Sequence, residues 1–268
     1  MNGPVLSMMS KALLFDLDDT LVIEEASAEA AFLATCERAR ERYGLDPQAL
    51  TQSVRERARQ LWFASPTHPY CRTIGISSWE GLWARFLGDD PHLKALREFA
   101  PTYRRDSWTR ALADQGVDDA GFGEELAETF REERRGRHIL FPDSEGILRD
   151  LRGNYTLGLI TNGVPDIQRS KIQGAGLEPH FKEIIISGEV GVGKPDPRIF
   201  EVALKRMAVP AEETAMVGNS LARDVIGAQR VGIRGIWLNR SGAEREEDCS
   251  PYAEIGSLTE LRHVIERF

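Results

Sequence analysis

Short apolar runs alternate with amphipathic stretches along most of this chain. The apolar runs cover residues 11–16, 155–161, 181–187, 213–218 and 234–239. Runs of this length without polar alternation are typical of parallel strands that are buried on both faces. Helical periodicity lies between the later runs, at residues 144–151, 165–173, 197–208 and 221–229. This alternation predicts an α/β fold, with a Rossmann-like parallel sheet core and helices on both faces. Ligands are then expected at the carboxyl ends of the strands.

Residues 24–137 have a different pattern, because apolar positions there recur almost throughout at helical spacing. One such series is Ala28, Ala31, Phe32, Thr35, Cys36, Ala39 and Tyr43. Another is Trp79, Leu82, Trp83 and Phe86. We therefore predict an all-helical cap domain at 24–137, inserted after the first strand. Residues 1–23 and 138–268 are predicted to form the α/β core domain.

Bulk composition excludes several classes of function. The 268 residues are 41% hydrophobic with a net charge of -8, and a nucleic-acid binder needs a surplus of basic residues. No apolar stretch approaches the roughly 20 residues of a membrane span, and no secretory signal precedes Ser10. We expect a cytoplasmic protein whose start is Met1, Met8 or Met9. The three cysteines form no CxxC pair, so we expect reduced packing residues rather than disulfides or a catalytic thiol.

The end of the first apolar run carries an acidic pattern, Asp16, Asp18 and Thr20. Two carboxylates two residues apart in a strand-end loop can share one cleft. One can attack phosphorus while the other protonates the leaving oxygen. Their repulsion from a phosphate favours a divalent cation. A calcium-binding or turn-capping cluster is the alternative interpretation.

Two later segments supply complementary groups. The hydroxyl of Thr161 and the amides of Asn162 and Gly163 follow a strand and precede a helix, where they can donate to phosphoryl oxygens or simply shape a turn. Lys194 is one of only six lysines and can neutralise charge near Asp16, although an isolated lysine is usually solvated.

These motifs, in this order, resemble the four motifs of the haloacid dehalogenase-like superfamily. Residues 16–22 resemble the first motif, Thr161 to Gly163 the second and Lys194 the third. The fourth runs from Gly218 to Asp224. The resemblance covers the whole α/β portion and implies a helical cap that closes over the substrate.

The resemblance also implies roles for these residues. Asp16 would be the nucleophile and Asp18 the general acid and base, with Mg²⁺ bound by the Asp16 carboxylate, the Asp18 carbonyl and Asp224. Thr161, Asn162 and Gly163 would bind phosphate, with Lys194 clamping it to Asp16, while Thr20 would support the loop. The chain departs from the pattern at Asn219, where the family most often has an acid. Asn219 can still ligate Mg²⁺ or orient its water, but we expect weaker binding because it brings no charge.

The sequence therefore predicts a Mg²⁺-dependent phosphatase that acts on a small phosphorylated metabolite. A haloacid dehalogenase is the first alternative, but halide needs no proton and the dehalogenases of the family lack the acid at Asp18. A sugar phosphomutase and a catalytically silent phosphate-binding protein are the others. Ser78, Trp79 and Glu80 resemble the N-acylneuraminate-9-phosphatase branch, with phosphoglycolate phosphatases as near neighbours. The segment from Ser65 to Trp79 is the expected substrate contact.

Overall fold

A computed structural model describes residues 11–245 and 249–266 of the chain. Met1, Met8 and Met9, the candidate starts, lie outside the described residues. No helix in the described ranges is long and apolar enough to cross a membrane.

In the described part of the chain, six parallel strands form one sheet in the order β3-β2-β1-β4-β5-β6. The strands are β1 (Ala12–Phe15), β2 (Thr156–Thr161), β3 (Glu183–Ile186), β4 (Thr214–Gly218), β5 (Arg234–Leu238) and β6 (Ala253–Ile255). The predicted parallel sheet is confirmed, and β6 is a short edge strand that the apolar pattern did not reveal. The chain runs outward from β1 to β3 and then returns to the other side of β1 at β4. This reversal of strand order places a ligand site at the carboxyl end of β1.

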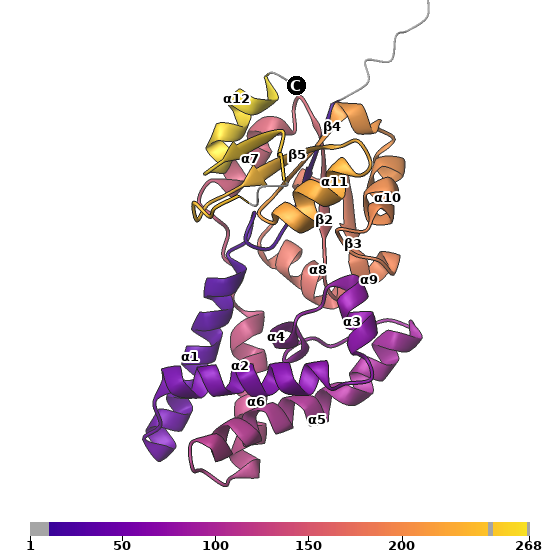
Figure 1. The fold of residues 1–268 in the computed structure, drawn as a ribbon. Helices are drawn as coiled ribbons and strands as arrows, with labels where there is room; N and C mark the ends of the chain where they lie inside the picture. Colours follow the sequence, from indigo (N-terminus) through magenta and orange to yellow (C-terminus); the bar gives the residue numbers. More distant parts are fainter. Residues whose placement is uncertain (1–10, 246–248, 267–268) are drawn as a thin grey trace, which may run out of the picture.

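Helices cover both faces of the sheet (Figure 1). Leu13 and Phe15 of β1 face the core that is shared with α7 (Ser144–Leu151), α8 (Pro165–Gly174) and α12 (Leu261–Ile265). Ala12 and Leu14 face the opposite core, shared with α10 (Pro197–Met207) and α11 (Gly227–Gln229). Alternate side chains of β1 are thus buried on both faces, which is why the strand reads as a continuous apolar run.

The remaining elements of the α/β part are short. They are α9 (Ser187–Val190), the 3₁₀ turns η1 (Glu178–His180), η2 (Ala211–Glu213) and η4 (Leu258–Glu260), and the π-helical η3 (Leu221–Ile226). The helix predicted at 221–229 is therefore a π-helical turn that continues into α11.

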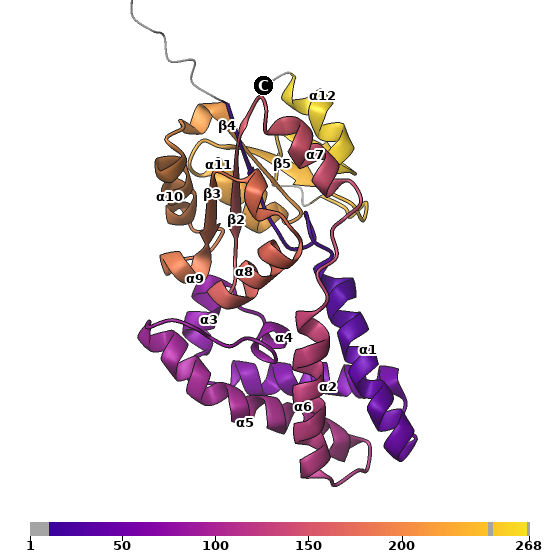
Figure 2. The same cartoon turned by 180° about the vertical axis from the view of Figure 1, so that it is seen from behind.

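Six helices between β1 and α7 form a separate layer beyond one end of the sheet (Figures 1 and 2). They are α1 (Glu24–Tyr43), α2 (Pro47–Phe63), α3 (His68–Ile74), α4 (Ser78–Gly81), α5 (Pro91–Asp114) and α6 (Ala120–Arg135). Their own apolar core includes Phe32, Trp62 and Trp108, and it extends to Val164 at the N-cap of α8 and Ile167 within α8. We call these residues, 24–135, the helical insert. The limits of the cap domain, 24–137, remain a prediction.

Aspartate–proline pairs begin several helices. Asp46, Asp90 and Asp196 each accept a hydrogen bond from a backbone N–H in the first turn of α2, α5 and α10. The proline that follows has no N–H to lose at this position, and its fixed φ suits a first turn. These local signals explain why the helix starts follow so directly from sequence.

One detail of the predicted helical pattern was wrong. The series from Trp79 to Phe86 is not one helix, because α4 ends at Gly81. Tyr43 ends α1 as the spacing predicts, although it is 39% exposed and its hydroxyl donates to Asp119.

The two connections between the insert and the α/β part run side by side. The Ile23 N–H donates to the Ile139 carbonyl at 2.8 Å, and the Phe141 N–H donates to the Leu21 carbonyl at 3.0 Å. Val22 and Leu140 form an antiparallel bridge between these bonds. The chain therefore enters and leaves the insert through one paired crossing, next to the loop that carries Asp16 and Asp18.

Candidate active site

A cavity of about 260 Å³ lies between the carboxyl ends of the central strands and the insert. The sheet side contributes Asp16, Asp18, Asp19, Thr161, Asn162, Lys194, Asn219, Arg223 and Asp224. The insert contributes Glu24, Gly75, Ser77, Trp79 and Glu80. The structure thus brings nearly all of the sequence-predicted site residues together. The expected substrate-contact segment, Ser65 to Trp79, lines the cavity through Gly75, Ser77 and Trp79, and Glu80 follows directly. Residues 65–70 of that segment do not line the cavity.

Lys194 joins two acids, Asp16 directly after β1 and Asp224 in η3, which follows β4. Its Nζ lies 2.5 Å from Asp16 Oδ1 and 2.7 Å from Asp224 Oδ1, and all three side chains are at least nine-tenths buried. Burial raises the pKa of Asp16, Lys194 opposes this and Asp224 adds to it. Burial alone would lower the pKa of Lys194, but attraction to the two carboxylates outweighs it and the pKa is raised. The ammonium therefore stays charged and holds Asp16 beside Asp224.

The loops after β1 and β4 are tied together through Thr20. Its hydroxyl donates to Asp16 Oδ2 at 3.1 Å and accepts from the Asn219 N–H at 3.1 Å. The Asn219 carbonyl accepts from Trp237 Nε1 at 3.0 Å, and the Ser220 N–H donates to Asp224 Oδ2 at 2.9 Å. These bonds fix the orientation of both acids without using the Asn219 side chain, which lines the cavity.

The loop after β2 is organised differently from the expectation. Thr161 and Asn162 line the cavity, but the Asn162 amide group pairs with the Lys194 backbone, accepting its N–H at 2.8 Å and donating to its carbonyl at 2.9 Å. The Gly163 N–H donates to Ser187 Oγ at 2.8 Å, so it would have to leave Ser187 to bind phosphate. In this structure Asn162 serves to position Lys194.

Asp18 is held by two residues of α8 that the sequence reasoning did not single out. Lys171 Nζ lies 2.9 Å from Asp18 Oδ1, and Gln168 Nε2 donates to Asp18 Oδ2 at 3.0 Å. Gln168 also donates to the Thr161 hydroxyl. Burial raises the pKa of Asp18 to about 6 although Lys171 pulls it down. The available signal was the presence of a lysine and a glutamine among the apolar positions of the buried face of α8.

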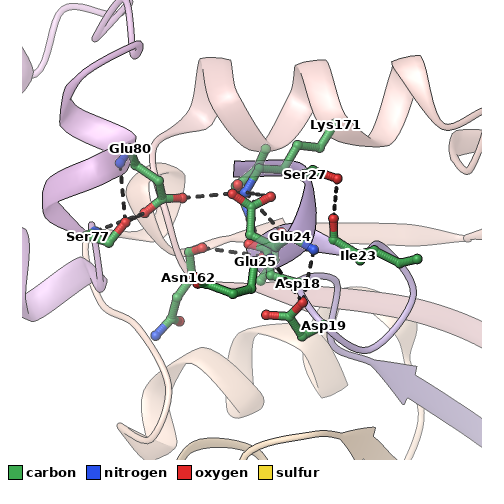
Figure 3. A network of polar contacts seen from close by, with 12 residues as sticks. Asp18, Asp19, Ile23, Glu24, Glu25, Ser27, Ser77, Glu80, Asn162 and Lys171 are labelled. Carbon is green, nitrogen blue, oxygen red and sulfur yellow. Dashed lines mark hydrogen bonds and ion pairs between the residues drawn. The ribbon is translucent and has the colours of Figure 1, made fainter. Parts of the chain in front are cut away.

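The insert supplies further carboxylates to the same lysine (Figure 3). Lys171 Nζ lies 3.0 Å from Glu24 Oε2 and 3.6 Å from Glu80 Oε1. Glu80 also accepts from the N–H and hydroxyl of Ser77 in a capping box that begins α4. Burial raises the pKa of Glu80, against the attraction of Lys171.

Asp19 connects the catalytic loop to the first helix of the insert. Its φ of 56° is unusual for a residue other than glycine, and its Oδ1 accepts from the Glu24 N–H at 2.9 Å and the Glu25 N–H at 3.3 Å. Ile23, at the N-cap of α1, has no side-chain oxygen that could accept these N–H groups. Asp19, four residues earlier, caps the helix in its place. Asp19 thereby fixes the start of α1 relative to Asp18.

The residues predicted to bind Mg²⁺ fit a small hard cation. The carboxylates of Asp16 and Asp224 contact one ammonium, and Asp18 and Asn219 line the same cavity. Such oxygen ligands are those that Mg²⁺ prefers, and it keeps several waters. The described ranges contain no group of three or more His, Cys, Asp or Glu that could hold a metal. The predicted set needs only two acidic side chains, so this finding is compatible with it.

The cysteines are placed as packing residues. Cys36 and Cys71 are buried, and burial raises the pKa of both thiols to about 12. A thiol must ionise to act as a nucleophile, so neither suits catalysis. Cys249 is also buried, beside Val225 and Trp237.

The chain is similar to several known proteins over most of its length. The sequence model of the family described as haloacid dehalogenase-like hydrolase matches residues 10–232. A phosphoserine phosphatase from Thermus thermophilus is 40% identical over 252 residues, which is 94% of this chain and 97% of the relative. An N-acylneuraminate-9-phosphatase from Mus musculus is 25% identical and covers 96% of this chain and 94% of its own length.

Solved structures show the same fold over nearly the whole length. The magnesium-bound putative hydrolase YfnB from Bacillus subtilis has a TM-score of 0.66 at 23% identity, covering 96% of this chain and 98% of its own. A 2-haloacid dehalogenase from Pseudomonas syringae has a TM-score of 0.61 at 29% identity, covering 97% and 99% respectively.

Proposed function

This chain belongs to the haloacid dehalogenase-like hydrolases, and we propose that it is a Mg²⁺-dependent phosphatase that cleaves a small phosphate monoester through an aspartyl-phosphate. One observation supports this proposal above the others. Asp16 is buried at the end of β1 against Lys194, and a second acid with a raised pKa, Asp18, lines the same cavity. A nucleophile and a proton donor that share one cavity are what ester cleavage needs.

In the first step a carboxylate oxygen of Asp16 attacks phosphorus, and the bond from phosphorus to the ester oxygen breaks. Asp18 gives its proton to that oxygen, which leaves as an alcohol. In the second step Asp18 accepts a proton from water as the water attacks phosphorus. Phosphate then leaves and the Asp16 carboxylate is restored. The pKa of Asp18 near 6 suits a group that must donate and accept in turn.

Lys194 and the cation site reduce the repulsion that this reaction must overcome. The ammonium of Lys194 lies on Asp16 and can also meet a phosphoryl oxygen there. Asp16, Asp224, the Asp18 carbonyl and Asn219 would hold Mg²⁺, which would supply positive charge that reduces the repulsion between the carboxylates and the phosphoryl group.

We assign the insert the role of a cap, within the predicted limits of 24–137. It contributes a wall of the cavity through Gly75, Ser77, Trp79 and Glu80. A wall over the reacting groups excludes bulk water and strengthens the electrostatic interactions inside. Residues 1–23 and 138–268 would form the catalytic core.

O-phosphoserine is the first substrate to test. The relative named phosphoserine phosphatase is similar over almost the whole of both chains, and a cavity of about 260 Å³ suits a metabolite of this size. The relatives named glyceraldehyde 3-phosphate phosphatase and N-acylneuraminate-9-phosphatase provide the next candidates.

Dehalogenation is the second candidate, because a solved 2-haloacid dehalogenase is 29% identical over nearly the full length. Asp18 argues against it. Displacing halide requires no proton, whereas here a partly buried acid is held in the cavity by Lys171 and Gln168.

A screen of phosphorylated metabolites with Mg²⁺ tests the proposal, with 2-chloropropionate included for the alternative. Wild type, Asp16→Asn and the exposed control Asp118→Asn are compared by released phosphate. We expect release by wild type and Asp118→Asn and none by Asp16→Asn. Phosphate release that survives in Asp16→Asn, or chloride release in place of phosphate release, would refute the proposal.

A further inference from the structure

Lys171 is enclosed by acids from separate parts of the fold (Figure 3). The side chain is fully buried in α8, and its ammonium contacts Asp18 in the loop after β1, Glu24 at the first residue of α1 and Glu80 in α4. None of the motifs recognised in the sequence contains Lys171. A buried ammonium is costly unless paired, so its position follows the positions of these carboxylates.

On the sheet side, α8 determines the direction of the Asp18 carboxylate. Lys171 contacts Oδ1 and Gln168 donates to Oδ2, so each oxygen has one donor from the same helix. Two donors one helical turn apart define both the plane and the direction of a carboxylate. The two donors of α8 therefore restrict rotation of the Asp18 carboxylate.

On the insert side, the same ammonium is anchored by groups that belong to different helices. Glu24 is also paired with Arg134 of α6, and both side chains are almost fully buried. Glu80 is fixed by Ser77 through the capping box of α4. Movement of α4 away from α8 would therefore remove Glu80 from the Lys171 ammonium, whereas Glu24 lies at the start of α1, where Asp19 accepts its N–H.

We propose that Lys171 is a positioning residue that couples the closed position of the insert to the orientation of the Asp18 carboxylate. The proposal rests on the phosphatase function and adds a reason why the proton donor is in place only when the insert is closed. Lys171 acts through Asp18 and touches neither phosphorus nor the leaving oxygen.

The test uses two esters that differ in their need for a proton. An alkyl phosphate, O-phosphoserine or the best alkyl substrate of the screen, needs protonation of its leaving oxygen, whereas p-nitrophenolate leaves without it. The variant is Lys171→Met. The matched control is Arg169→Met, which removes an exposed cation of α8 that pairs with Glu189.

For Lys171→Met we expect kcat/KM to fall about 10²-fold on the alkyl ester and less than about threefold on p-nitrophenyl phosphate, since a misplacement of about 1 Å can cost this much. Arg169→Met should behave as wild type. Equal losses on the two esters would show a merely structural role and overturn the proposal, and so would no loss on either.

Glu80→Gln tests the coupling itself and does not depend on Lys171→Met folding. The amide keeps acceptor and donor groups for Ser77 but loses its charge toward Lys171. We expect the preference for the alkyl ester over p-nitrophenyl phosphate to fall about fivefold in Glu80→Gln, with no further fall when it is added to Lys171→Met. An unchanged preference, or additive losses, would overturn the coupling. If wild type releases no phosphate, or if Asp16→Asn still does, the phosphatase proposal fails instead.

Discussion

Replacing Asn219 by aspartate should tighten Mg²⁺ binding. The backbone of Asn219 is held by Thr20 and Trp237, so the substitution leaves the loop in place and changes only the group that faces the cavity. The new carboxylate would join those of Asp16 and Asp224, both of which contact the Lys194 ammonium.

Coulomb attraction indicates the size of the effect. Unit charges about 4 Å apart interact by about 1 kcal/mol in water, so a carboxylate and a divalent cation gain about 2 kcal/mol. Repulsion from the two existing carboxylates offsets part of this gain. A net gain of about 1.4 kcal/mol corresponds to about tenfold tighter binding.

Isothermal titration calorimetry with Mg²⁺ measures the affinity directly, and a melting curve in EDTA measures the cost of the added charge. Asn219→Asp should bind Mg²⁺ about tenfold more tightly than wild type and melt at a lower temperature without metal. The control is Asn154→Asp, which adds the same charge at an exposed position. An unchanged dissociation constant in Asn219→Asp would refute the assignment of this position to the metal site.

Three further predictions concern buried groups. Glu24→Gln should lower the free energy of unfolding at pH 7 by about 3–5 kcal/mol in urea denaturation, against less than about 1 for the more exposed Glu29→Gln. Burial would raise the pKa of Glu24, but its cationic partners lower the pKa below the usual 4.5. The stabilisation that Glu24 contributes is therefore complete above pH 4.5 and is lost as pH falls through the lower pKa of the folded state. A difference in unfolding free energy between wild type and Glu24→Gln that persists in acid would contradict this account. For the alkyl ester, kcat/KM should decline as pH rises through about 6, because Asp18 must be protonated to donate, and a flat profile would argue against this role. Iodoacetamide at neutral pH should leave Cys36 unmodified by peptide mass spectrometry, since its pKa is about 12.

The site on the sheet could be predicted because its geometry follows from strand order. Carboxyl ends of parallel strands converge at one edge, so Asp16, Thr161 and Asp224 had to lie near one another once their strands were recognised. The three-residue β6 offered too short a pattern to be recognised.

The region from Trp79 to Phe86 shows why a helical spacing of apolar residues is not sufficient for a helix. Arg104 donates to the carbonyls of Gly81 and Ala84, and Arg97 donates to that of Phe86. These side chains from α5 satisfy carbonyl groups that a helix would have paired within itself. Such long-range hydrogen bonds leave no local trace in the sequence.

Lys171 and Gln168 escaped prediction for a related reason. Periodicity assigns them to the buried face of α8, but it does not identify their partners. Those partners come from residues about 90 to 150 positions earlier in the chain, through Asp18, Glu24 and Glu80. Only the placement of the insert against α8 brings these acids together.

Trapping the phosphorylated enzyme tests the central claim most directly. Wild type is mixed with Mg²⁺ and its best substrate, quenched in acid within a single turnover, and digested for mass spectrometry. The account predicts one added phosphoryl group on the peptide that contains Asp16, and none in Asp16→Asn. A phosphoryl group on another residue, or phosphate release by wild type with no phosphorylated peptide at any time, would contradict it.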